Sequence, residues 1–229
     1  ASFLSVNDLQ LGRGEPIEDT AKVLSSMVNG LVLRTLKHET LLEFANNSSV
    51  PIINGLSDRS HPCQLLADIL TFYEKRGSIK GKKVTWFGDF NNVCFSYAQA
   101  ADLFEFEFWV ACPKEYIPDS KFKFKNTIFT TSISDAAKNS DLISTDVWVS
   151  MGDENETEKR VDAFSNFQVN EQVLDLAQTD VLFLHCLPAI RGNEISSTLF
   201  EDPRSYVFTQ AENRLHAQKG LLLNLLSDN

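Results

Sequence analysis

Short apolar runs rich in β-branched and aromatic residues alternate with longer segments of helical periodicity along the chain. Parallel strands need a long crossover between them, usually a helix, so this alternation predicts an α/β fold with parallel sheets covered by helices. The expected strands cover residues 31–33, 50–53, 84–88, 106–111, 128–130, 142–144 and 181–184. The expected helices cover residues 17–28, 39–46, 62–76, 93–103, 134–138 and 211–226.

Two local patterns carry more specific expectations. The pair Asn54-Gly55 follows the apolar run 50–53 and is typical of a turn. Lys121, Lys123 and Lys125 alternate with phenylalanines. This alternation indicates an edge strand protected by charge rather than a surface that stacks on nucleic-acid bases.

The composition is that of a globular protein and excludes several classes of function. Of the 229 residues, 43% are hydrophobic and 23% are charged, which is far from the disordered class. No apolar stretch is long enough to span a bilayer, and the first residues lack the pattern of a secretory signal, so we expect a cytoplasmic protein. The formal net charge of −10 argues against an extended nucleic-acid surface but leaves room for a small anion in a local basic pocket.

The cysteines are widely spaced, and none belongs to a C-x-x-C pair. The pattern therefore favours neither a disulfide framework nor a zinc module, and we expect no metal. The four cysteines are Cys63, Cys94, Cys112 and Cys186.

Polar residues follow several of the expected strands. Ligands of open parallel sheets bind beyond the carboxyl ends of the strands, so these residues are the candidates for a site. His61 and Gln64 lie three apart at a helix start, where side chains and free backbone N–H groups can face one anion or carbonyl. Asp146 ends the strand 142–144, where a carboxylate can pair with a substrate ammonium.

These residues also allow other interpretations. His61 can equally cap or pack, and the run 153–158 is typical of a solvated acidic loop. His185 and Cys186 can supply a nucleophile or metal ligands, although adjacent residues of an extended segment face opposite sides. The turn Gly88-Asp89 lacks the G-x-G-x-x-G glycines, which disfavours a nicotinamide-dependent oxidoreductase.

Five segments, taken in their order along the chain, resemble the ornithine carbamoyltransferases. The resemblance extends over essentially the whole chain, and the His-Pro-x-Gln element is shared with aspartate carbamoyltransferases. The segments are His61-Pro62-Cys63-Gln64, Gly88-Asp89-Phe90-Asn91-Asn92, residues 146–152, His185-Cys186-Leu187-Pro188 and Glu212-Asn213-Arg214.

The resemblance implies transfer of the carbamoyl group of carbamoyl phosphate to the δ-amine of L-ornithine, giving L-citrulline and phosphate without a metal or organic cofactor. The carbonyl oxygen gains negative charge during transfer and needs hydrogen-bond donors, while the leaving phosphate needs cations. By resemblance, Arg34, His61 and Gln64 serve the carbamoyl end of the reaction. Arg214 closes on the same end from the last helix.

The resemblance assigns the remaining candidates to the amino-acid substrate. Asp146 pairs with the α-ammonium, and Asp146 and Cys186 orient the δ-amine and assist the loss of its proton. Cys186 is then a polar positioning group and not a covalent nucleophile. Residues 150–158 form a lid that excludes water. The residues expected to bind substrate are Gln64, Asn92, Asp146, Ser150, Met151, Cys186 and Leu187.

The resemblance also implies two parallel-sheet α/β domains and a homotrimer or a multiple of it. Residues 1–64 correspond to part of a carbamoyl-phosphate domain and residues 65–205 to an ornithine domain. Residues 206–229 form a helix that returns to the first domain.

The sequence departs from the family pattern in two places. The phosphate-binding Ser-Thr-Arg-Thr-Arg motif is absent, so we expect the 229 residues alone to be inactive or severely impaired, whereas Ile190, at an ordinarily aromatic or His position, is tolerated.

Two alternatives remain at this stage. One is a non-catalytic relative that binds an amino acid or assembles with an active subunit. The other is a carbamoyltransferase for a different amine, such as putrescine. The sequence does not distinguish arginine biosynthesis from the catabolic direction of the same reaction.

Overall fold

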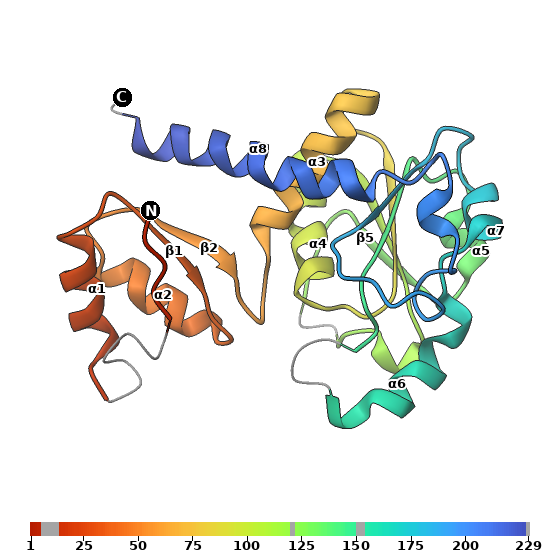
Figure 1. Ribbon diagram of the computed structural model, residues 1–229. Helices are drawn as coiled ribbons and strands as arrows, with labels where there is room; N and C mark the ends of the chain where they lie inside the picture. The colour runs from red at the N-terminus through yellow and green to blue at the C-terminus, as the bar shows by residue number, and fades with distance from the viewer. Residues whose placement is uncertain (6–13, 120–121, 150–153, 228–229) are drawn as a thin grey trace.

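The computed structural model describes residues 1–5, 14–119, 122–149 and 154–227, and it contains two parallel sheets that lie side by side (Figure 1). The smaller sheet has two strands and the larger has five, in the order β5-β4-β3-β6-β7. Every pairing within them is parallel, as the alternation of strands and helices predicts. Within the described residues, no helix combines the length and the apolar run needed to cross a membrane.

The two-stranded sheet and its helices make up the N-terminal region. β1 alternates half-buried and exposed residues, so only one side of this strand is covered. The elements are α1 (Ile17–Ser25), β1 (Leu31–Arg34), α2 (His38–Asn47) and β2 (Ile52–Leu56).

The five-stranded sheet forms the core of the larger region. Its strands are β3 (Lys83–Phe87), β4 (Glu107–Ala111), β5 (Thr127–Thr130), β6 (Leu142–Thr145) and β7 (Leu182–His185). Its α-helices are α4 (Asn92–Phe104), α5 (Ile133–Ala137), α6 (Thr157–Phe164) and α7 (Glu171–Asp175). The short 3₁₀ turns are η3 (Lys114–Tyr116), η4 (Glu154–Glu156), η5 (Ser165–Phe167) and η6 (Leu199–Glu201).

Every residue of β6 and β7 is buried, as expected for parallel strands covered on both faces. Large aromatic side chains fill the space between the sheet and its helices. Tyr97 of α4 stacks on Phe108 of β4, and their ring centroids are 5.5 Å apart. The ring centroid of Tyr97 also lies 5.8 Å from that of Trp86. Each such side chain contributes about 1.5–3 kcal/mol by burial, so this core carries most of the stability of the larger region.

Two long helices connect the regions. α3 (Pro62–Arg76) begins at a proline, whose missing N–H costs nothing there, and ends at Gly77, whose φ is +75°. α8 (Val207–Leu226) packs along α3 and runs back toward the two-stranded sheet (Figure 1). A buried bond from Asn213 Nδ2 to Thr71 Oγ1, 3.0 Å, joins the two helices.

The last helix begins four residues before the expected start at 211, at Val207. The backbone N–H of Tyr206 donates to Phe183 O at 2.9 Å, so the chain passes directly from the side of β7 into the helix. The run 206–209 is aromatic and β-branched, which is typical of a strand rather than a helix, and packing against β7 overrides that preference.

Two local expectations are wrong. Asn54-Gly55 is not a turn but part of β2, because β1 and β2 approach so closely that a Cβ on Gly55 would lie 3.0 Å from Leu33 O. Residues 122–125 form no strand, and the edge strand β5 begins at Thr127. Phe122 and Phe124 pack instead on Phe90, with ring centroids 6.0 and 6.1 Å away.

Candidate functional site

Polar side chains from both regions meet beyond the carboxyl ends of the strands. Arg34 ends β1, His61 caps α3, and Asp146 and Cys186 follow β6 and β7. Arg214 lies two turns inside α8 and reaches the start of α3. The elements of both sheets therefore contribute to one site.

His61 lies between two cationic side chains. It is only 6% exposed, and its backbone N–H donates to Ser96 Oγ at 2.8 Å. Burial, together with the smaller effects of the Arg214 and Arg34 charges, lowers the pKa of His61 to about 4. The imidazole is therefore neutral at pH 7. Its Nδ1 is buried and has no hydrogen-bond partner among the described residues, so it is available to a ligand.

Gln64 and Arg214 are joined directly across α3 and α8. Arg214 Nη1 donates to Gln64 Oε1 at 2.7 Å, and Gln64 Nε2 donates to Asp68 Oδ1 at 2.9 Å. The amide oxygen of Gln64 thus faces the arginine and its NH₂ group faces away from it. With His61 nearby, these groups make an electropositive pocket suited to an anion that also carries a carbonyl or amide.

Asp146 is the centre of the second half of the site. Its Oδ1 accepts from the backbone N–H of Val147 and its Oδ2 from Asn91 Nδ2, both at 2.8 Å. Burial and the neighbouring carboxylate of Asp146 raise the pKa of the Cys186 thiol well above its ordinary value. The thiol is therefore protonated and hydrogen-bonds to Asp146. This protonation argues against a thiolate nucleophile at neutral pH.

His185 stabilises the segment that carries Cys186. Its Nδ1 accepts from the backbone N–H of Leu187 at 2.9 Å, and its Nε2 lies 3.2 Å from Glu194 Oε1 in a fully buried pair. Leu187 has a φ of +53°, an uncommon value for a non-glycine residue, and this bond helps to hold it.

A metal is geometrically conceivable at this position. Asp146, His185 and Cys186 each offer a ligand atom, and these atoms lie within 4.8 Å of one another. However, both ring nitrogens of His185 are already engaged, with Leu187 and with Glu194. Ligation would take His185 away from the buried Glu194 or leave the Leu187 N–H without its acceptor, so the residues are arranged for hydrogen bonding.

The remaining candidates have different positions. Asn92 opens α4 and donates from Nδ2 to Ser57 O at 2.8 Å, which ties the larger region to the loop before α3. Ser150 and Met151 lie outside the described residues. Of the expected lid, the part from 154 to 158 is not a loop, because it forms η4 and the start of α6.

Two residues of the site escaped the sequence analysis as individual candidates. Asn91 caps α4 through its side-chain oxygen and uses its amide to hold Asp146. Asp68 lies one turn after Gln64 and accepts from it. The i, i+4 spacing of Gln64 and Asp68 on a helix was the signal that could have revealed this pair.

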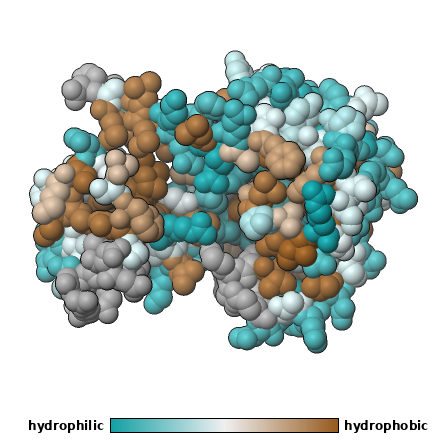
Figure 2. All heavy atoms as spheres, in the orientation of Figure 1, coloured by the Kyte–Doolittle hydropathy of each residue, from teal (hydrophilic) through white to brown (hydrophobic). Residues whose placement is uncertain are grey.

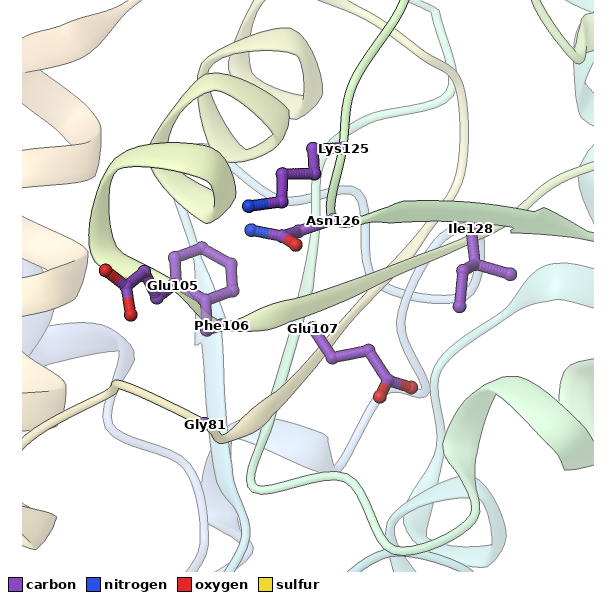
Figure 3. A pocket seen from close by; sticks show the side chains of 7 residues that line it. All are labelled: Gly81, Glu105, Phe106, Glu107, Lys125, Asn126 and Ile128. Carbon is purple, nitrogen blue, oxygen red and sulfur yellow. The ribbon is translucent and has the colours of Figure 1, made fainter.

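An open hollow of about 450 Å³ lies elsewhere, beside the amino ends of β4 and β5 (Figure 3). Gly81, Glu105 and Lys125 are among its lining residues. None of the candidate site residues that the structure describes lines it. Ligands of parallel sheets bind at the opposite, carboxyl edge, so this hollow is not the candidate site.

Comparison with known proteins agrees with this geometry. Residues 1–74 match the family model described as aspartate/ornithine carbamoyltransferase, carbamoyl-P binding domain. Residues 80–225 match the corresponding Asp/Orn binding domain. The break between the two matches lies just after α3.

Individual relatives are similar over nearly the whole chain. The ornithine carbamoyltransferase of Psychrobacter cryohalolentis is 55% identical over 231 residues, which cover 100% of this chain and 76% of the relative. The anabolic ornithine carbamoyltransferase of Pseudomonas aeruginosa is 56% identical over 225 residues, covering 97% of this chain and 74% of the relative.

Solved structures agree with the sequence relatives. Ornithine carbamoyltransferase from Pyrococcus furiosus superposes with a TM-score of 0.90 at 45% identity, covering 96% of this chain and 74% of that structure. The enzyme from Thermus thermophilus superposes at 0.89 with 43% identity, covering 98% and 76%. On the matches of both domains and of these relatives, the chain belongs to the aspartate/ornithine carbamoyltransferase family.

Proposed function

We propose that the protein containing these 229 residues transfers the carbamoyl group of carbamoyl phosphate to the δ-amine of L-ornithine. The observation that carries the proposal is the meeting of two unlike half-sites at the strand ends. One half is cationic and holds a neutral imidazole, formed by Arg34, His61 and Arg214. The other half is the hydrogen-bonded pair of Asp146 and Cys186.

The cationic half suits carbamoyl phosphate. Arg34 and Arg214 supply positive charge for the phosphate, which leaves as an anion. Neutral His61 can donate a hydrogen bond to the carbonyl oxygen as that oxygen gains negative charge during attack. Gln64 contacts the amide end of the same group. If His61 were charged at pH 7, it would instead form a permanent ion pair with the phosphate.

The second half suits an α-amino acid. The carboxylate of Asp146 pairs with the α-ammonium, and Asn92 with Ser150 and Met151 completes the binding of the head group. Asp146 and the protonated Cys186 orient the δ-amine and assist the loss of its proton. The backbone at Cys186 and Leu187 helps to hold the carbamoyl group. Holding both substrates in line supplies a large part of the rate enhancement.

In this proposal residues 1–64 bind the carbamoyl donor, residues 65–205 bind ornithine, and residues 206–229 return to the donor side. We further propose a cytoplasmic homotrimer, or a multiple of it, that acts in arginine biosynthesis without a metal or cofactor. The relatives from Pseudomonas savastanoi and Pseudomonas aeruginosa that are named anabolic support this direction.

Citrulline formation from carbamoyl phosphate and L-ornithine tests the function, measured on the protein expressed from its own gene. Turnover with ornithine that exceeds turnover with putrescine by at least about 100-fold is expected, because putrescine lacks the head group that Asp146 pairs with. A preference for putrescine would contradict the substrate assignment. Ornithine that binds in calorimetry without any citrulline formation would instead identify a non-catalytic relative.

A further inference from the structure

One buried carboxylate, that of Asp68, lies between the two half-sites. Asp68 is 1% exposed and accepts hydrogen bonds from three helices. Gln64 Nε2 of α3 donates to its Oδ1 at 2.9 Å, and Gln210 Nε2 of α8 donates to the same oxygen at 2.6 Å. Tyr97 of α4 donates to Oδ2 at 2.7 Å.

An ionised carboxylate only accepts hydrogen bonds, so it decides the orientation of each amide that faces it. Both Gln64 and Gln210 must turn their NH₂ groups toward Asp68. Their oxygens then point the opposite way. Gln64 Oε1 accepts from Arg214 on the cationic side, and Gln210 Oε1 accepts from the backbone N–H of His185 at 2.9 Å.

The two outward oxygens reach both halves of the site. Gln64 Oε1 faces the place proposed for the amide end of carbamoyl phosphate. Gln210 Oε1 holds the backbone of His185, which directly precedes Cys186. We infer that Asp68 is a positioning residue for the transfer, which fixes Gln64 and Gln210 so that both amide oxygens face the site. This role rests on the proposed function, because it needs a carbamoyl group for Gln64 to meet.

The charge state of Asp68 is part of this role. Burial raises the pKa of Asp68 to about 6, although the bonds from Tyr97, Gln210 and Gln64 and the charge of Arg214 oppose the rise. Tyr97 faces it from α4, Arg214 from α8, and Cys186 from the segment after β7. A protonated Asp68 donates from one of its oxygens, so it can no longer accept hydrogen bonds from Gln64, Gln210 and Tyr97 all at once.

The test compares Asp68→Leu with Thr71→Val in the protein expressed from its own gene. Leucine keeps the shape of aspartate and removes both oxygens, whereas asparagine would keep one oxygen that accepts from Gln64 and Gln210. Asp68 and Thr71 lie on α3, and each joins α3 to α8 by a buried hydrogen bond. Among the described residues Thr71 has no hydrogen bond to Gln64 or Gln210, so Thr71→Val removes a helix contact without touching either amide. We expect kcat/KM for carbamoyl phosphate to fall by about 10- to 100-fold in Asp68→Leu and to stay within about 3-fold of wild type in Thr71→Val.

A double-mutant cycle shows whether Asp68 acts through Gln64. In a Gln64→Ala background, Asp68→Leu should lower kcat/KM for carbamoyl phosphate by a smaller factor than in the wild-type background, because only its action through Gln210 remains. The pH profile is a second readout. Wild-type kcat/KM should fall as the pH drops through about 6, and this fall should be weaker in Asp68→Leu, since the titration of the substrate itself is common to both.

Each outcome has one meaning. If the wild type forms citrulline and Asp68→Leu behaves like Thr71→Val, the positioning role is overturned while the proposed function stands. Full additivity of Asp68→Leu with Gln64→Ala, or identical pH profiles of wild type and Asp68→Leu, also overturns the role. If the wild type forms no citrulline, the proposed function fails, and the role fails with it.

Discussion

The five-stranded and two-stranded sheets share the same parallel plan but differ in how completely they are covered. β6 and β7 are buried at every residue, whereas β1 alternates half-buried and exposed residues. Figure 2 shows apolar side chains gathered over the N-terminal region and the C-terminal end of α8. The exposed apolar residues there include Val23, Met27, Val32, Leu36, Leu42 and Leu223.

Because the two sheets differ in how completely they are covered, the two halves of the candidate site are held in place in different ways. Asp146 and Cys186 follow two fully buried strands, so the rigid core of the larger sheet sets their positions. Arg34 ends a half-covered strand, and His61 and Arg214 stand on the helices that connect the regions. The half proposed for the amino acid therefore has its own scaffold, whereas the half proposed for the carbamoyl donor depends on how α3 and α8 pack.

The largest expected effect is on the covered sheet. Phe108→Ala removes a fully buried ring that stacks on Tyr97. The free energy of unfolding should fall by about 3–5 kcal/mol, through lost burial and the cavity left behind. Urea denaturation measures it, and a loss below about 1 kcal/mol would contradict the account of the core.

The second prediction concerns Asp68 and the pH dependence of the free energy of unfolding. Because its pKa is raised in the folded state, the folded protein holds this proton more tightly than the unfolded chain, and stability falls as the pH rises through about 6. Between about pH 4.5 and 7, wild type should lose about 2 kcal/mol relative to Asp68→Asn. Urea denaturation across this range checks it, and parallel curves would show that Asp68 does not titrate as described.

His61 should make the free energy of unfolding depend on pH in the opposite direction. Its pKa is lowered to about 4, so the unfolded chain binds the proton more tightly and stability falls as the pH drops from about 6.5 toward 4. At about pH 5 the folded protein should lose about 2 kcal/mol, a loss absent in His61→Gln. The imidazole resonances of His61 in NMR spectra should show no protonation above about pH 5, and a midpoint near 6.5 would refute the buried, neutral state.

The smallest effect belongs to the open sheet. Val32 is 62% exposed, so Val32→Ala should change the free energy of unfolding by less than about 0.5 kcal/mol. A cost above about 1 kcal/mol would show that this face is covered in solution, and the contrast between the two sheets would then disappear.

The alternation of apolar runs and helical segments was sufficient to predict the parallel sheets, because it reflects burial on both faces. The predictions of local structure were wrong where contacts between residues distant in sequence determine the conformation. Gly55 continues β2 because Leu33 of the neighbouring strand approaches it, and Val207 is helical because Tyr206 is anchored to β7. Neither contact is visible in the local sequence.

The site shows the same limit. His61, Gln64, Asp146 and Cys186 stand in short motifs, and the sequence could single them out. Asp68 matters through partners on three helices, and the distance of 142 residues between Asp68 and Gln210 hides their bond from any local pattern. Its orientation of two amides follows only from the fold.

We propose that the covered sheet presents Asp146 to the amino-acid substrate. The direct test is kcat/KM for L-ornithine in citrulline formation, compared between wild type, Asp146→Asn and Asp135→Asn, an exposed carboxylate on α5. Loss of a buried charged partner costs about 2–5 kcal/mol, so Asp146→Asn should lower kcat/KM at least about 30-fold, while Asp135→Asn stays within about 2-fold. Equal values for all three proteins would contradict the claim.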